Sequence, residues 1–252
     1  RLCPSDIERD SLRRLDNAFK AFFRRVKSGD KPGFPRFKCR TRWNSFTVPA
    51  TSKRMIQGSK VRVMGVGGWV RARNIQEIDG TIKQQHIIRR AGKWYCHFVV
   101  ESAAVPERRA VKTTVGIDVG LKTFASMSDG SVIENPRFGR KIARKLAHAH
   151  RNLSRTKKGS RNRRKAIARL QTVYEKLRNQ RMNFTHHASK EIVSKYDLIA
   201  VEDLNIKGLA RGMLAMSVND AGWAQFFGFG AYKAEDAGRL WVKVIPNGTS
   251  QE

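Results

Sequence analysis

The sequence predicts two folded units: an α+β unit of one helix and short strands, then an α/β unit that carries a basic helical hairpin. Apolar residues make up 40% of the 252 residues, enough for a folded core. Short β-rich runs end near residue 102, and from residue 114 the order becomes strand, strand, long helices, strand, helix, strand. Residues 103–112 between them are polar and contain proline, which predicts a domain boundary.

The first predicted element is a helix within residues 1–30. Ser5 and Glu8 match a capping box, and Gly29 should end the helix. Apolar residues recur at helical spacing at Leu12, Leu15, Phe19, Phe22, Phe23 and Val26. Basic side chains, among them Arg24 and Arg25, occupy the other faces. They fit either a solvated surface or a contact with nucleic-acid backbone, because charge spacing does not separate the two.

Residues 31–110 predict a small barrel or sandwich. A Pro/Gly-rich turn at 31–38 precedes short β-rich runs at 45–50, 60–65, 68–74, 81–90 and 93–102. Lys and Arg alternate with the aromatic residues Phe37, Trp43, Trp69 and Trp94, a mixture typical of β-domains that contact nucleic acid. For any single one of these rings, packing in the core is the simpler interpretation.

The second unit should open with three strands, the third within SVIENP, followed by two basic helices at 138–156 and 161–195 joined by KKGS. A strand at 196–202, a helix at 217–238 and a final strand at 239–245 complete it. The two basic helices favour an antiparallel hairpin. Its dense positive charge predicts phosphate contacts. The residues expected to make them are Lys157, Lys158, Arg161, Arg163, Arg164 and Arg169.

Two carboxylates stand out on the predicted strands of this unit. Asp118 lies inside the apolar run of TVGIDVGLKTFASMSDG (114–130), where a strand disfavours Asp and burial of an unpaired charge is costly. Glu202 ends the apolar run of YDLIAVEDLNIKG (196–208). If these strands are neighbours, the carboxylates converge into a site suited to two Mg²⁺ ions and phosphodiester hydrolysis. Taken singly, Asp118 also fits a turn residue and Glu202 a helix cap.

The charge balance indicates a polyanionic partner. Fifty-one Lys and Arg residues face 21 acids, a formal net charge of +30, and nucleic acid is the usual counterpart. No apolar run approaches a membrane-spanning length and no signal peptide opens the chain, so we expect no membrane partner and a cytoplasmic location. Cys3, Cys39 and Cys96 are scattered, which predicts neither a disulfide framework nor a zinc site within these residues.

Five segments together carry a resemblance to a known family. GIDVGLKTFASMSDG resembles the first RuvC motif of the TnpB family, transposon-encoded RNA-guided DNA nucleases related to compact type V CRISPR effectors, and LIAVEDLNIKGLAR resembles the second. FKAFFRRVKSGDKPGFPRFK, SRTKKGSRNRRK and the closing GTSQE are also similar, in the same order. The resemblance implies a recognition-type helix at 1–30, a wedge domain at 31–110 and an RNase H-like (RuvC) nuclease domain at 111–252.

The resemblance also implies a function. Asp118 and Glu202 match the first and second catalytic carboxylates, and the family's activity is Mg²⁺-dependent cleavage of target DNA directed by a guide RNA, here expected at the bacterial nucleoid. In the family, the TSQ run leads into a four-cysteine Zn²⁺ module and then a third catalytic Asp. This chain ends at Glu252, before both. The chain as given is therefore not expected to be competent alone.

Other functions fit part of the sequence. A sugar-kinase or actin-like ATPase also begins with a strand–Asp–Gly turn, but Leu121, Lys122 and Phe124 replace the small hydroxylated residues expected there, and no second glycine-rich phosphate loop follows. A cleavage-inactive RNA-guided DNA-binding protein, acting as a repressor, would not need Asp118 and Glu202. A ribosomal-type RNA-binding protein explains the charge but not the paired carboxylates. The sequence predicts no oligomeric state, guide identity or flanking DNA motif.

Overall fold

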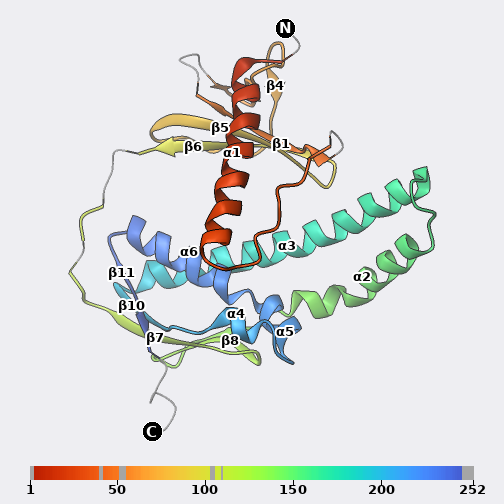
Figure 1. Cartoon of the computed structure of the whole chain (residues 1–252). Helices are drawn as coiled ribbons and strands as arrows, with labels where there is room; N and C mark the ends of the chain where they lie inside the picture. The colour runs from red at the N-terminus through yellow and green to blue at the C-terminus, as the bar shows by residue number, and fades with distance from the viewer. Residues whose placement is uncertain (1–2, 40–41, 51–54, 103–105, 109, 246–252) are drawn as a thin grey trace. The chain divides into compact units, whose positions relative to one another are not determined.

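The computed structural model describes residues 3–39, 42–50, 55–102, 106–108 and 110–245 (Figure 1). The fold is mixed α/β with several sheets. The chain divides into two compact units, residues 1–104 and 105–252, and the division falls within the segment 103–112. The closing GTSQE segment lies outside the described residues.

Unit 1 begins with helix α1 (Ser5–Lys27). The predicted capping box is wrong: Pro4 is the N-cap residue, with no side-chain cap. The carbonyl of Pro4 instead accepts hydrogen bonds from the backbone N–H groups of Ile7 and Glu8, at 3.0 and 3.3 Å, so Ser5 already belongs to the first turn. The predicted end is confirmed, because Gly29 takes a left-handed φ of 72° and its N–H bonds to the carbonyl of Val26.

A buried carboxylate attaches α1 to strand β1 (Ser45–Pro49). Asp10 is only 3% exposed. Its oxygens accept hydrogen bonds from the backbone N–H of Thr47 at 2.9 Å and from the guanidinium groups of Arg13 and Arg14 at 2.7 and 2.8 Å. Arg14 also donates to the carbonyl of Ser45 at 3.0 Å. The charge of Asp10 is thus fully compensated where the helix meets the sheet.

Two three-stranded sheets follow α1. One pairs β1 with β5 (Thr81–Arg90) and β5 with β6 (Lys93–Glu101), all antiparallel. The other joins β2 (Ile56–Gln57), β3 (Lys60–Val61) and β4 (Val70–Arg71). A small core of Val61, Val63 and Ile87 lies between them. The two sheets are separate in the described part of the chain, so the predicted barrel-like arrangement is not confirmed.

The strands expected at 60–65 and 68–74 are shorter than predicted. Each keeps two residues, in β3 and β4. The connection between them contains Gly65 and Gly68 at φ values of 83° and 77°, which a pleated strand cannot adopt. Turn geometry therefore replaces the ladder over most of this stretch.

Unit 2 is built on a five-stranded sheet. Its strands are β7 (Thr114–Val119), β8 (Thr123–Met127), β9 (Val132–Glu134), β10 (Leu198–Glu202) and β11 (Leu240–Val244). The spatial order is β11-β10-β7-β8-β9. The first three strands in sequence form an antiparallel meander, while β10 and β11 run parallel to β7. Strand β7 is central and therefore lies beside β10, although the two strands are far apart in the sequence.

The described part of unit 2 also contains helices α2 (Phe138–Ser154), α3 (Arg161–Lys195), α4 (Ile206–Leu209), α5 (Ala215–Ala221) and α6 (Trp223–Asp236). The long helix α3 has the predicted bounds, and the hydroxyl of Ser160 caps it by accepting from the backbone N–H of Arg163 at 3.1 Å. The single helix predicted at 217–238 is wrong. Gly222 takes a left-handed φ of 76° and divides that segment between α5 and α6.

The core of unit 2 lies on one face of the sheet, where α3 and α6 pack. Ile192 of α3, Ile199 of β10 and Phe226 of α6 are almost fully buried there. The rings of Phe124 and Phe226 meet edge to face, with centroids 5.1 Å apart. A second, smaller core joins α2 to α3, which run side by side and antiparallel (Figure 1). The predicted helical hairpin is therefore present.

Candidate active site

Strand β7 exposes Asp118 on the face opposite the core. Val115, Ile117 and Val119 are buried, and Asp118 between them is exposed. The expected cost of placing a charge in an apolar strand does not arise, because successive side chains of a strand point to opposite faces and this carboxylate is directed to solvent. Because Asp118 is exposed, it pays no desolvation penalty and needs no counter-charge to be tolerated in this strand.

Strand β10 places Glu202 beside Asp118. The parallel register pairs Leu198 with Thr114 and continues to Val201 with Ile117. Glu202 and Asp118 are the next residues of the two strands and keep the same separation of 84 residues in the sequence. Residues in register on neighbouring parallel strands share a face, with backbones about 5 Å apart. The two carboxylates therefore converge on the open face, at the carboxyl ends of their strands.

The register that aligns these carboxylates is set at the other end of the strands by Asp197. Its Oδ2 accepts hydrogen bonds from the backbone N–H groups of Lys112 and Thr113, each at 3.1 Å. These two bonds are the main reason that the pKa of Asp197 is lowered. The carbonyl of Thr113 in turn accepts from the N–H groups of Asp197 and Leu198. Asp197 is not among the site residues predicted from the sequence; its position just before an apolar strand was the available signal.

Small hydroxyl side chains surround the carboxylates on the open face. Ser126 of β8 pairs directly across from Asp118 and is exposed. The hydroxyl of Ser128 accepts a hydrogen bond from the backbone N–H of Gly116 at 3.0 Å. Asp203, the residue after Glu202, is engaged elsewhere, because its carboxylate is 2.8 Å from the ammonium of Lys243. Asp118 and Glu202 are thus the carboxylates that share this face at the same register.

The chemistry of this pair fits divalent metal binding. Hard carboxylate oxygens are the protein ligands that Mg²⁺ prefers, with water and phosphate oxygens completing the coordination. Among the described residues, no group of three or more His, Cys, Asp or Glu side chains lies together as a metal site. Asp118 and Glu202 by themselves can supply two of the ligands that a Mg²⁺ ion requires. Within the part of the chain that the structure describes, Cys3, Cys39 and Cys96 form no disulfide.

Most of the basic residues predicted to contact nucleic acid are exposed near the tip of the α2–α3 hairpin. These are Lys157, Lys158, Arg161, Arg164 and Arg169. Arg163 differs, because it is half-buried and its guanidinium donates to the carbonyls of Leu153 and Thr156 at 3.2 and 3.1 Å. It therefore satisfies carbonyls at the carboxyl end of α2. Helix α2 adds exposed basic residues that the site prediction did not name: Arg140, Lys141, Arg144, Lys145 and Arg151.

The two arginines predicted as contacts on α1 have different surroundings. Arg24 is exposed. Arg25 is half-buried, and its Nε donates to the carbonyl of Pro32 at 2.6 Å, holding the segment after the helix against α1. Only Arg24 presents its charge mainly to solvent.

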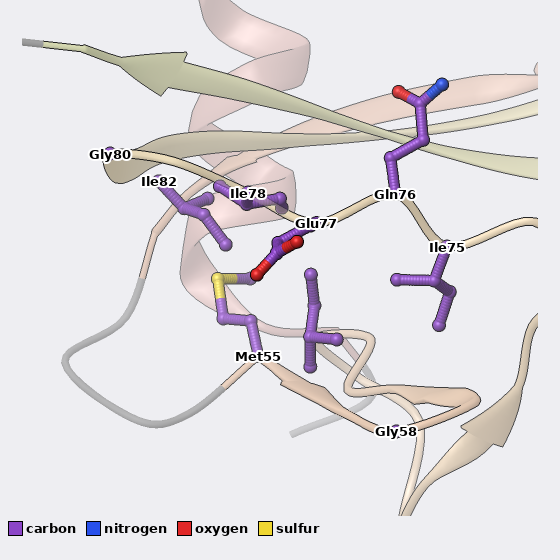
Figure 2. Close-up of a pocket in the computed structure, with 9 residues that line it drawn as sticks. Met55, Gly58, Ile75, Gln76, Glu77, Ile78, Gly80 and Ile82 are labelled. Carbon is purple, nitrogen blue, oxygen red and sulfur yellow. The ribbon is translucent and has the colours of Figure 1, made fainter.

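Unit 1 also contains a shallow hollow of about 480 Å³ (Figure 2). Its walls are mainly Met55, Ile56, Ile75, Ile78 and Ile82. Figure 2 shows the carboxylate of Glu77 directed toward Met55, while the amide of Gln76 points away from the hollow. The described residues that line it include no basic side chain that could bind phosphate.

The described helices lack the combined length and hydrophobicity of membrane-spanning helices. None of them is both long and apolar enough to cross a bilayer.

Comparisons with known proteins identify relatives of this chain. A family model described as "Probable transposase" matches residues 97–213, a range that contains both Asp118 and Glu202. "Putative RNA-guided DNA endonuclease InsQ" of Escherichia coli (strain K12) is 30% identical over 98% of this chain and 64% of its own length. "Putative RNA-guided DNA endonuclease" of Streptomyces pristinaespiralis is 33% identical over 62% of this chain and 39% of its own length.

These matches confirm the recognition made from the sequence. The chain is similar to the family described as "Probable transposase" over residues 97–213 and, over 98% and 62% of its length, to two proteins named as putative RNA-guided DNA endonucleases. It spans less than two thirds of the length of these two relatives. A solved complex of Cas12f1 with sgRNA and target DNA aligns with 67% of this chain and 37% of its own, at 18% identity and a TM-score of 0.49.

Proposed function

We propose that this protein is an RNA-guided DNA endonuclease of a transposable element, with Asp118 and Glu202 as its first two catalytic carboxylates. The observation that carries the proposal is their placement on one open face, at the same register of the neighbouring parallel strands β7 and β10. Two segments 84 residues apart in the sequence thus contribute one carboxylate each to one point of the fold.

In this proposal the carboxylates act as ligands. By the family resemblance, Asp118 and Glu202 would hold two Mg²⁺ ions together with a third Asp that is not among residues 1–252, and the family's Zn²⁺ module would accompany that Asp. When bound, two such ions would activate a water and stabilise the leaving oxygen of a phosphodiester. The strands β7 and β10 set the spacing of the two carboxylates, and α3 and α6 pack on the other face of the same strands. The order of the five strands is consistent with an RNase H-like (RuvC) assignment.

The basic surface of the chain holds the nucleic acids. The exposed lysines and arginines of the α2–α3 hairpin and Arg24 contact backbone phosphates, which bind any sequence and carry no base code. Sequence selection then comes from pairing between a guide RNA and the target DNA strand, with the protein reading a short flanking motif. A protein with these partners would act in the cytoplasm, at the nucleoid.

The test is programmed cleavage by the full-length protein with its guide RNA. Asp118→Ala and Glu202→Gln should each lower cleavage in Mg²⁺ by at least about a thousandfold while target binding stays within about threefold, because the lost interactions act on the metal-bound transition state. Reprogramming the guide should redirect both binding and cleavage. A wild-type protein that binds guided targets and never cuts them would instead be the repressor considered above. Full cleavage by Asp118→Ala would contradict the proposed site.

A further inference from the structure

The end of strand β7 that carries Asp118 is held mainly by β8 and by the turn that follows. The ladder between β7 and β10 ends at the pair of Ile117 with Val201, one residue before Asp118. On the other side of β7, the pairing with β8 continues past Asp118. The backbone N–H of Gly120 then donates to the carbonyl of Phe124 at 3.2 Å and closes the β7–β8 turn. The position of the Asp118 carboxylate therefore depends on β8 and on this turn.

The side chain of Asn135 holds this turn from outside the ladder. Asn135 directly follows β9, and its Nδ2 donates to the carbonyl of Leu121, inside the turn, at 2.9 Å. Its Oδ1 accepts from the backbone N–H of Arg137 at 3.1 Å, which is an Asx turn. The guanidinium of Arg137 adds longer bonds, at 3.4 Å, to the carbonyls of Leu121 and Lys122. The Asx turn needs only the side-chain oxygen, so the bond to Leu121, 14 residues away in the sequence, is a separate use of this amide.

The segment that carries Asn135 is itself fixed to the helices of unit 2. The backbone N–H of Gly139, in the first turn of α2, donates to both carboxylate oxygens of Asp220 of α5, at 2.7 and 2.8 Å. A Cβ atom on Gly139 would lie only 2.7 Å from Asp220, so this approach requires glycine. Asp220 also accepts from the guanidinium of Arg181 of α3 at 2.7 Å. Because the segment is bonded to α3 and α5, Asn135 can restrain the turn rather than move with it.

We propose that Asn135 is a positioning residue for the carboxylate site: by holding the β7–β8 turn, it keeps Asp118 in register with Glu202. That this site serves DNA cleavage rests on the proposed function. Asn135 acts through the backbone of the turn and contacts neither metal nor substrate. Groups that support metal ligands in this way typically change metal affinity or activity by roughly 10- to 100-fold when they are removed. A displacement of about 1 Å at the reacting groups is enough for a loss of that size.

The test compares Asn135→Ala and Asn135→Asp in the full-length protein with its guide RNA. Asn135→Asp keeps the oxygen of the Asx turn and loses the donor to Leu121, so it separates a local turn role from positioning. Both variants should bind Mg²⁺ about tenfold more weakly in calorimetry and lower the kcat of programmed cleavage about tenfold, with KM within about threefold of wild type. The added negative charge of Asn135→Asp would by itself favour Mg²⁺, so weaker binding reports the lost position.

The matched control is Asn219→Ala, which removes a bond from Nδ2 to the carbonyl of Ala215 within α5, at 2.7 Å, and should leave Mg²⁺ affinity and kcat unchanged. Wild-type behaviour of Asn135→Asp would overturn the proposal and leave Asn135 as an Asx-turn residue only. Equal losses in Asn135→Ala and Asn219→Ala would overturn it as well. If wild type binds Mg²⁺ and never cuts DNA, the proposed nuclease fails, while the Mg²⁺ affinities of the variants still test Asn135. Cleavage that depends on Asp118 and not on Asn135 is the opposite case.

Discussion

The two faces of strands β7 and β10 are built from alternating residues of the same short segments, yet their environments are opposite. Ile117 and Val201 are buried against α3 and α6, whereas their neighbours Asp118 and Glu202 lie on the open face. The pleat alone makes this separation, because successive side chains point to opposite faces. Stability and the proposed chemistry can therefore be changed separately by substitutions only one residue apart.

The largest expected effect is the difference between two substitutions at adjacent positions, one on the buried face of β7 and one on its open face. Ile117→Ala should lower the free energy of unfolding of unit 2 by about 2–5 kcal/mol, because it removes buried methyl groups and leaves a cavity. Asp118→Ala should change it by less than about 0.5 kcal/mol, or raise it slightly without metal by relieving repulsion from Glu202. Denaturant unfolding of the two variants measures the difference.

Comparable destabilisation by both variants would break this comparison. Asp118 would then be a structural residue, and its exposed position would need another explanation. A matched variant on β10, Val201→Ala, should resemble Ile117→Ala, because Val201 is equally buried.

The α2–α3 hairpin also has one buried apolar face and one exposed charged face. Its inner face buries Ile142, Val173 and Leu177, and its outer face is basic. Replacing Lys157, Lys158 and Arg161 by Gln should weaken nucleic-acid binding for all sequences and lower the slope of log affinity against log salt by about 2–3, one contact per charge removed. Binding measured at several salt concentrations gives this slope.

Arg163→Gln is the control within the same hairpin. Its guanidinium donates to carbonyls at the end of α2, so its loss should destabilise the hairpin by about 1 kcal/mol and leave the salt slope nearly unchanged. A slope change as large as that of an exposed lysine would show that Arg163 contacts phosphate, as the sequence predicted. An unchanged slope for the triple variant would mean that the exposed charges are only solvated.

The smallest expected effect concerns the carboxylate that aligns β7 with β10. The pKa of Asp197 is lowered by the backbone N–H groups of Lys112 and Thr113, so its ionised form stabilises the fold. That stabilisation is present above its ordinary pKa of 3.8 and is lost as the pH falls below it. Asp197→Asn should therefore be less stable than wild type at neutral pH, with the gap closing in acid, where protonated Asp resembles Asn.

Unfolding of wild type and Asp197→Asn across acidic pH measures that gap. Glu191→Gln removes an exposed ion pair with Lys195 and should show little change at any pH. A gap between wild type and Asp197→Asn that stays constant into acid would show that the charge of Asp197 does not support the register.

The elements that could be predicted from the sequence are those whose signals are local. Helix α3 has its predicted bounds because Ser160 caps it and an apolar stripe runs along it. The break at Gly222 was not predicted, because a glycine alone does not mark a break: Gly228 and Gly230 both lie inside α6. Gly230 is tolerated there because the ring of Trp241 occupies the space that a side chain would need. That packing partner lies on another element and leaves no local signal.

The candidate site, too, could be predicted from the sequence only in part. The alternation around Asp118 and the apolar run before Glu202 could be read directly, and the family resemblance named both residues. Their common register could not be read, since it depends on pairing between β7 and β10 and on the contacts of Asp197 with Lys112 and Thr113. The two-residue strands β2, β3 and β4 likewise form through tertiary packing around Val61, with little propensity of their own.

The most direct test of the central claim is divalent metal binding by the full-length protein, measured by calorimetry with Mg²⁺ for wild type, Asp118→Asn, Glu202→Gln and the double variant. If the two carboxylates form one site, each single substitution should abolish most of the binding, and the double variant should lose little more, because residues that share a ligand are not additive. Two independent, additive losses, or Mg²⁺ binding unchanged in Asp118→Asn, would contradict a shared metal site on the open face of the sheet.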